Sequence, residues 1–161
     1  MTLRDAWQKE SGNWIRFART PKHDRYYALL NLPKFLDLLP APGRLTVDVG
    51  CGEGRVGREL EARGHRVVGF DYSEPAVRAL RLAGTGDAGA VADAARLPLR
   101  TGSADLAIAF MSLQDMDRPG AVIEEIGRVL EPGGRFCFAL LHPFGSAGEF
   151  QDDKRRFVVQ H

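Results

Sequence analysis

The sequence has few cysteines, no excess of either charge and no long apolar run. Its two cysteines, Cys51 and Cys137, repeat no spacing, so they indicate neither a disulfide framework nor a metal site, and we expect both to be reduced. The net charge of +1 gives no general field for nucleic acid or an acidic membrane. No membrane span or signal peptide is recognisable. These absences favour a cytoplasmic protein with neither nucleic acid nor a membrane as a partner.

The chain has the length of one domain. Its 161 residues can bury roughly two-thirds of the surface that the unfolded chain would expose. We expect residues 1–43 to form a helical lid or brace, interrupted near Pro33. The run Pro-Ala-Pro-Gly at 40–43 favours neither helix nor strand, so the ligand-binding domain is expected to cover residues 44–161.

Strand and helix patterns alternate from residue 44 onward. We expect strands at residues 45–49, 66–70, 90–92, 105–111 and 135–141, and helices at 55–63, 74–83 and 119–130. The strands are apolar on successive residues, which is typical of a parallel sheet covered on both faces. The expected fold class is therefore α/β, with a doubly wound, mainly parallel sheet and right-handed crossovers.

Polar residues follow the ends of the expected strands. Ligands of such a sheet bind outside the carboxyl ends of its strands. Asp48, Asp71, Asp93 and His142 stand at these ends, so three carboxylates and a histidine are expected along one rim. Three acids indicate a ligand that is rich in hydrogen-bond donors.

A glycine-rich turn follows the first strand of the sheet. The run from Gly52 to Gly57 matches the dinucleotide fingerprint G-x-G-x-x-G, and Asp71 lies near the offset of a ribose-binding acid. Glu53 and Asp48, however, place negative charge where the two phosphates would lie. S-adenosylmethionine has no phosphate and carries a sulfonium and an ammonium, so it suits this turn better.

Five segments occur together in a characteristic order. They are Val47-Asp-Val-Gly-Cys-Gly-Glu-Gly-Arg55, Gly69-Phe-Asp-Tyr-Ser73, Ala92-Asp-Ala94 before Leu97-Pro98, Ser103-Ala-Asp-Leu-Ala107, and Glu125-Ile-Gly-Arg-Val-Leu-Glu-Pro-Gly-Gly-Arg135. In this respect the chain resembles the class I S-adenosylmethionine-dependent methyltransferases, in particular small-molecule enzymes related to those of quinone biosynthesis. The resemblance covers about residues 45–141 and implies a Rossmann-like sheet with strand order 3-2-1-4-5.

The resemblance implies roles around the first two strands. The backbone of Gly50, Cys51 and Gly52 would wrap the methionine portion of the cofactor. Asp48 would reach its amino group, directly or through water. Asp71 would accept both ribose hydroxyls. Within residues 1–43, Arg19 is the natural charge partner for the methionine carboxylate, although an ordinary surface role suits it better.

Further roles are implied at the later strand ends. Tyr72 would stack on adenine, Asp93 would accept the adenine amino group, and the Ala94 amide would meet a ring nitrogen. Phe110 and Met111 would line the sulfonium end. The catalytic task is then to align an acceptor with the methyl carbon and to exclude water, and S-adenosylhomocysteine is the product.

Other interpretations remain open for single residues. Asp71 could cap a helix, Asp48 could be a polar strand end, and Cys51 fits the turn through its small size. His142 is a weak candidate for a catalytic base, and a capping or solvent-facing histidine is at least as compatible with the pattern.

The chain departs from the family after its fifth strand. The family usually adds a helix and two further strands, whereas about twenty residues follow Leu141 here and offer at most one short strand at 157–159. We expect a truncated product rather than a sheet edge covered by a second copy in a homodimer. The favoured function is a small-molecule methyltransferase. An NAD-type oxidoreductase and a silent methyltransferase-like binding or dimer module are the alternatives.

Overall fold

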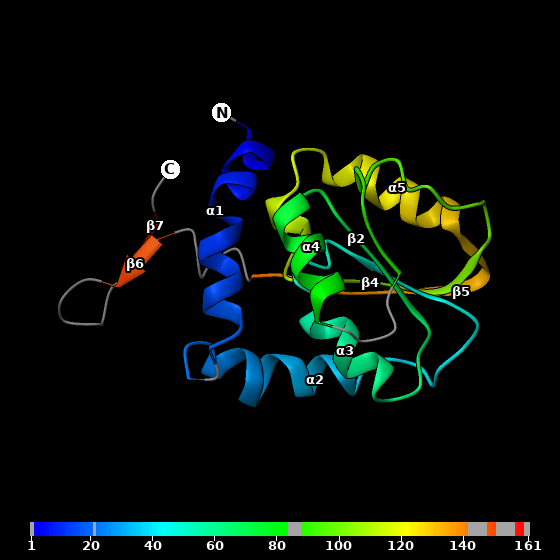
Figure 1. Ribbon diagram of the computed structural model, residues 1–161, viewed down its shortest axis with the longest axis horizontal. Coiled ribbons are helices and arrows are strands. Elements are labelled where there is room, and N and C mark those ends of the chain that lie inside the picture. Colours follow the sequence, from blue (N-terminus) through cyan, green and yellow to red (C-terminus); the bar gives the residue numbers. More distant parts are fainter. Residues whose placement is uncertain (1, 21, 84–87, 142–147, 151–156, 160–161) are drawn as a thin grey trace.

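The centre of the molecule is a five-stranded parallel sheet with helices on both faces (Figure 1). The computed structural model describes residues 2–20, 22–83, 88–141, 148–150 and 157–159. The strands are β1 (Thr46–Val49), β2 (Val67–Asp71), β3 (Ala88–Val91), β4 (Ala104–Phe110) and β5 (Leu130–Ala139). Their order, β3-β2-β1-β4-β5, confirms the predicted doubly wound sheet.

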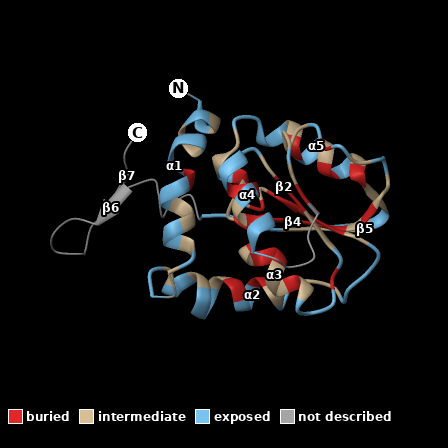
Figure 2. Ribbon diagram, in the orientation of Figure 1, coloured by how far each residue is buried: buried red, intermediate tan, exposed pale blue. Residues whose placement is uncertain are grey.

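Two hydrophobic clusters cover the two faces of the sheet. Alternate residues of β4 point to opposite sides, as the pleat of a strand requires. Ala107 and Ala109 belong to one cluster, and Leu106, Ile108 and Phe110 belong to the other. The buried residues are concentrated in the strands and on the helix sides that face them (Figure 2).

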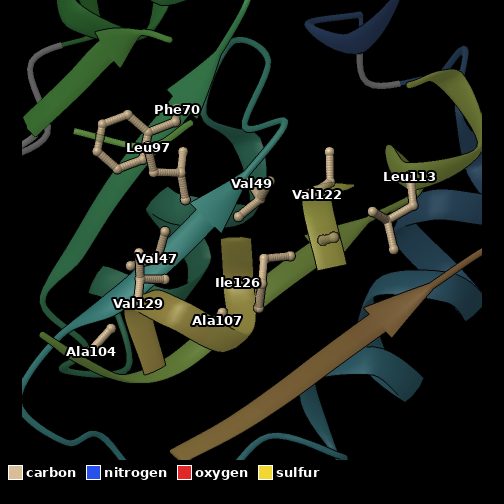
Figure 3. Close-up of a cluster of buried hydrophobic side chains, with 11 residues drawn as sticks. Val47, Val49, Phe70, Leu97, Ala104, Ala107, Leu113, Val122, Ile126 and Val129 are labelled. Carbon is tan, nitrogen blue, oxygen red and sulfur yellow. The ribbon is translucent and has the colours of Figure 1, made fainter. Parts of the chain in front are cut away.

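Three helices connect the strands. They are α3 (Arg55–Glu61), α4 (Glu74–Leu82) and α5 (Pro119–Val129), and a 3₁₀ turn, η2 (Leu113–Asp115), follows β4. Val122 and Ile126 of α5 pack against Val47 and Val49 of β1 (Figure 3). Helix α3 lies on the opposite face, where it contributes to the second cluster.

The N-terminal segment contains several helical elements. Helix α1 (Leu3–Ala18) begins with a capping box between Thr2 and Asp5. A π-helical turn, η1 (Tyr27–Asn31), continues directly into α2 (Leu32–Leu36). The predicted break near Pro33 is wrong, because the π turn changes the hydrogen-bond register just before a residue that has no N–H to donate.

The largest difference from the predicted strand bounds is in β5. This strand begins at Leu130, which pairs with Ala104 before a register irregularity, whereas residue 135 was the expected start. A separate antiparallel pair follows, β6 (Gly148–Phe150) and β7 (Phe157–Val159). The short strand expected at 157–159 is β7, and β6 was not predicted. Among the described helices, none is long and apolar enough to span a membrane.

Candidate functional site

A cavity of about 380 Å³ lies at the carboxyl ends of β1, β2 and β4. Helix α1 supplies part of its wall. All ten residues proposed from the sequence to hold a cofactor line it: Asp48, Gly50, Cys51, Gly52, Asp71, Tyr72, Asp93, Ala94, Phe110 and Met111. Parallel strands end at the same edge of a sheet, which brings these distant residues together.

The glycine turn after β1 needs glycine for two reasons. Gly50 and Gly52 have φ angles of 76° and 56°, in the left-handed region that favours glycine. A Cβ atom on Gly50 would also lie 2.6 Å from the Cβ atom of Ser112. Across the cavity, Met111 adopts a φ of 54° without being glycine. Such a conformation is costly and is often found at binding sites.

Asp71 connects the end of β2 to the glycine turn. Its Oδ2 accepts a hydrogen bond of 2.8 Å from the Gly52 N–H, and its Oδ1 accepts one of 2.8 Å from the Ser73 N–H. Burial raises the pKa of the Asp71 carboxyl, and these backbone hydrogen bonds partly oppose that shift. Ser73 caps α4 by accepting from the Ala76 N–H, so Asp71 is not the helix cap. Its carboxylate is held at the cavity wall.

Asp48 is buried beside the same turn. Its side chain is 2% exposed, and its Oδ2 has no hydrogen-bond partner among the described residues. Burial, assisted by the charge of Asp71, raises the pKa of Asp48 to about 7. A buried acceptor without a donor is costly, so the position fits a cationic group of a ligand.

Asp93 already has cationic partners. Its Oδ2 lies 2.8 Å from Arg4 Nη2 of α1 and 3.4 Å from Arg118 Nη2, and its Oδ1 accepts from the Ala95 N–H. The hydrogen bond from Arg4 is the main cause that lowers the pKa of Asp93. The Arg4 guanidinium also lies over the Tyr72 ring, 4.0 Å from its centroid.

One face of α1 forms a wall of the cavity. Arg4, Trp7, Ser11 and Trp14 follow each other at spacings of three and four residues and all line the cavity. The Trp7 and Trp14 rings meet edge to face with their centroids 5.8 Å apart. These residues were not proposed from the sequence, although their helical spacing is a signal that could have found this face.

Arg55 is a second residue that sequence reasoning missed. It begins α3 directly after the glycine turn and lines the cavity. Its Nη1 lies 2.8 Å from Asp24 Oδ2, and its guanidinium lies 3.7 Å from the centroid of the Tyr27 ring. Asp24 and the aromatic ring therefore fix a cation beside the turn.

Comparison with known proteins identifies the family. A family model described as a methyltransferase domain matches residues 47–138, which is more than half of the chain. The chain belongs to the methyltransferase domain family. Its predicted membership of the class I S-adenosylmethionine-dependent methyltransferases is thereby confirmed.

Individual relatives agree with this assignment. An uncharacterized methyltransferase of Mycobacterium tuberculosis is 35% identical over 104 residues, which cover 64% of this chain and 42% of that protein. A ubiquinone biosynthesis O-methyltransferase of Ralstonia nicotianae is 31% identical over 112 residues, with coverages of 64% and 45%. The chain thus spans less than half the length of these curated relatives.

Solved structures show the same fold. An S-adenosylmethionine-dependent methyltransferase of Mesorhizobium loti has a TM-score of 0.72 and 30% identity, and the match covers 80% of this chain and 62% of that chain. A putative methyltransferase of Haloferax volcanii, solved in complex with the Trm112 activator, has a TM-score of 0.69 and 27% identity, with coverages of 87% and 61%.

The structure corrects one electrostatic argument made from the sequence. Glu53 is 1% exposed and does not present a free charge to the turn. Arg58 Nη2 donates to both of its carboxylate oxygens at 2.8 and 2.9 Å, and Arg19 Nε donates to Oε2 at 2.9 Å. The charge of Glu53, which argued against a phosphate ligand in the sequence analysis, is thus neutralised by the two arginines. Arg19, which the sequence suggested only as a candidate partner of the methionine carboxylate, pairs with Glu53 and is not among the residues that line the cavity.

Cys51 and His142 are the remaining candidates from the sequence. Cys51 of the glycine turn is 8% exposed, and burial raises the pKa of its thiol well above the usual range. A thiol held protonated is a poor nucleophile, which favours the interpretation that Cys51 fits the turn through its size. His142 lies outside the described residues.

Proposed function

We propose that this chain binds S-adenosyl-L-methionine in the cavity and transfers its methyl group to a small-molecule acceptor in the cytoplasm, leaving S-adenosylhomocysteine. The observation that carries the proposal is Asp48 Oδ2, which has no hydrogen-bond partner among the described residues and is buried beside a glycine turn that lines the same cavity. A buried carboxylate oxygen without a donor matches a ligand that carries an ammonium and a sulfonium.

Asp71 is the proposed ribose ligand. Each of its carboxylate oxygens accepts one backbone hydrogen bond, and an ionised carboxylate has about four lone-pair sites. Capacity therefore remains for two hydroxyl donors. The bonds from Gly52 and Ser73 fix the orientation of the carboxylate before a ligand arrives.

The remaining contacts follow the cavity wall. Tyr72 and Asp93 are proposed to receive the adenine ring and its amino group, with the Ala94 amide at a ring nitrogen, and Phe110 and Met111 are proposed to face the sulfonium. All five line the cavity.

Arg55 takes the place that the sequence suggested for Arg19. It lines the cavity directly after the glycine turn, whereas Arg4 and Arg118 lie at Asp93. We therefore propose Arg55 as the charge partner of the methionine carboxylate. Its ion pair with Asp24 and its contact with the Tyr27 ring restrict its movement, which makes it a positioned charge rather than a mobile one.

Methyl transfer from a sulfonium requires little acid or base catalysis by side chains of the protein. The sulfonium of the bound cofactor supplies an activated methyl group and a good leaving group. The residues of the chain hold that cofactor, keep water out and place the acceptor in line with the methyl carbon. The indole rings of Trp7 and Trp14 on α1 form an apolar wall suited to both tasks.

The organisation of the chain follows from this site. We propose that residues 1–43 act as a lid over a cofactor-binding domain formed by residues 44–161. Under the alternative of a homodimer, a second copy of the chain would cover the outer edge of β5, where Phe138 is half exposed. Size-exclusion chromatography with light scattering tests this, and a monomer at all concentrations would refute it.

A thermal-shift experiment tests the proposed cofactor class. S-adenosylhomocysteine is expected to raise the melting temperature, and to raise it further as its concentration increases, because a ligand that binds only the folded state stabilises it. NADH serves as the matched ligand for the dinucleotide fingerprint. Stabilisation by NADH alone would overturn the proposal and favour an oxidoreductase.

A further inference from the structure

Arg4 contacts both of the residues that the proposed site assigns to adenine. Its guanidinium bonds to Asp93 Oδ2 at 2.8 Å and lies 4.0 Å from the centroid of the Tyr72 ring. These two residues come from the ends of different strands, β2 and β3. One side chain of α1 therefore fills the space between a hydrogen-bond acceptor and an aromatic face.

The guanidinium resembles the part of adenine that would bind there. Both groups are planar, both donate N–H bonds to a carboxylate, and both stack on an aromatic ring. A ligand whose amino group needs Asp93 and whose ring needs Tyr72 must compete with Arg4 for each. The arginine side chain is 34% exposed, so it can leave toward solvent.

We propose that Arg4 is a built-in competitor for the adenine subsite, which the incoming cofactor must displace. This inference rests on the proposed function, because it concerns the same cavity. Arg4 then lowers the affinity for cofactor and product, in contrast to a residue that adds a favourable contact. The remainder of α1 can stay in place during the exchange.

Other contacts of α1 support displacement of the side chain alone. The Leu3 N–H donates to Asp117 Oδ1 at 3.0 Å, and Arg19 bonds to Glu53 at the far end of the helix. Both contacts are independent of Asp93 and Tyr72. The helix is thus anchored at both ends while Arg4 moves.

The test compares ligand affinities of matched variants by isothermal titration calorimetry. The ligands are S-adenosylhomocysteine and adenosine, neither of which carries a net charge, so a general change of field has little effect. Arg4→Ala is expected to bind both about three- to tenfold more tightly than the wild type, since it removes a partly exposed ion pair and a cation–π contact from the competing state.

Two controls separate displacement from simpler explanations. Arg118→Ala removes the same charge from the same Asp93 oxygen without clearing the Tyr72 ring, and it is expected to change affinity less than about twofold. Asp117→Ala loosens the same end of α1 but leaves Arg4 between Asp93 and Tyr72. Its affinity is also expected to change less than about twofold.

Each outcome decides the inference. Tighter binding by Arg4→Ala alone supports it. Unchanged or weaker binding by Arg4→Ala overturns it, and so does equal tightening by Asp117→Ala, which would assign the effect to loosening of the helix. If the wild type and Arg4→Ala bind neither ligand, the proposed function itself fails, and the inference fails with it.

Discussion

Arg19 Nε donates a hydrogen bond of 2.9 Å to Glu53 Oε2, and this contact joins the end of α1 to the glycine turn. A second bond from Arg19 reaches the backbone oxygen of Ala79 in α4. Arg58 holds Glu53 from within α3. Helix α1 and the turn are therefore connected through one buried carboxylate.

Removing the charge of this carboxylate should destabilise the protein. Glu53→Gln keeps the shape but leaves two arginines without their anion, and a loss of about 1–3 kcal/mol in the free energy of unfolding is expected. Denaturant titration measures it. Glu59→Gln, in an exposed pair with Arg63, is the control and should cost less than about 1 kcal/mol. Equal effects would show that burial of Glu53 has no energetic consequence.

Gly50 should not tolerate a side chain. Gly50→Ala would place a Cβ atom 2.6 Å from Ser112 Cβ at a φ of 76°, so a loss of about 1–3 kcal/mol and of ligand binding is expected. Gly127→Ala, in an open position of α5, should instead stabilise the protein by about 0.5–1 kcal/mol. Urea unfolding of both variants would contradict this account if their changes had the same sign.

Asp48 should make stability depend on pH. Its pKa is raised from 3.8 to about 7, so the folded state binds more protons than the unfolded state between these values. The contribution of this group to stability is present at low pH and is lost as the pH rises toward about 7. Relative to the wild type, Asp48→Asn should gain stability over this range, by at most ~1.4 kcal/mol per pH unit, and gain no more above it.

The control for Asp48 is an exposed aspartate. Asp37 lies outside the cavity, so Asp37→Asn makes the same chemical change at an exposed position. Guanidinium titrations at several pH values measure both variants against the wild type. If the difference between Asp48→Asn and the wild type is constant from pH 4 to 8, Asp48 is not a buried acid with a raised pKa.

The two cysteines should differ in reactivity. Cys51 is buried with a pKa raised well above the usual range, whereas Cys137 is only partly buried. A thiol-specific disulfide reagent at pH 8 is therefore expected to label Cys137 first. Cys137→Ser isolates the slow reaction of Cys51, which S-adenosylhomocysteine should slow further. Rapid labelling of Cys51 would show that the turn is more open than described.

The parts of the site that could be predicted are those encoded locally. The glycine turn, and the acids Asp48, Asp71 and Asp93 after successive strands, could be placed together because parallel strands end at one edge. The positions that failed depend on side-chain pairings that form only in the folded structure. The direction of Glu53 is set by Arg19 and Arg58, and neither pairing has a sequence pattern of its own.

The contribution of α1 was missed for a similar reason. Its helical spacing could be read, but the surface it would cover depends on tertiary packing. Arg4 meets Asp93 only because α1 crosses the ends of β2 and β3. The π turn before Pro33 likewise adjusts the backbone around a proline that would otherwise predict a break.

The most direct test of the proposed cofactor site is calorimetric titration of S-adenosylhomocysteine into the wild type, Asp71→Asn and Asp37→Asn. The wild type and Asp37→Asn should bind with the same affinity. Asp71→Asn should bind at least about tenfold more weakly, because it loses charge-assisted bonds to two hydroxyls. Equal affinity of Asp71→Asn and the wild type would contradict the assignment of Asp71 to the ribose.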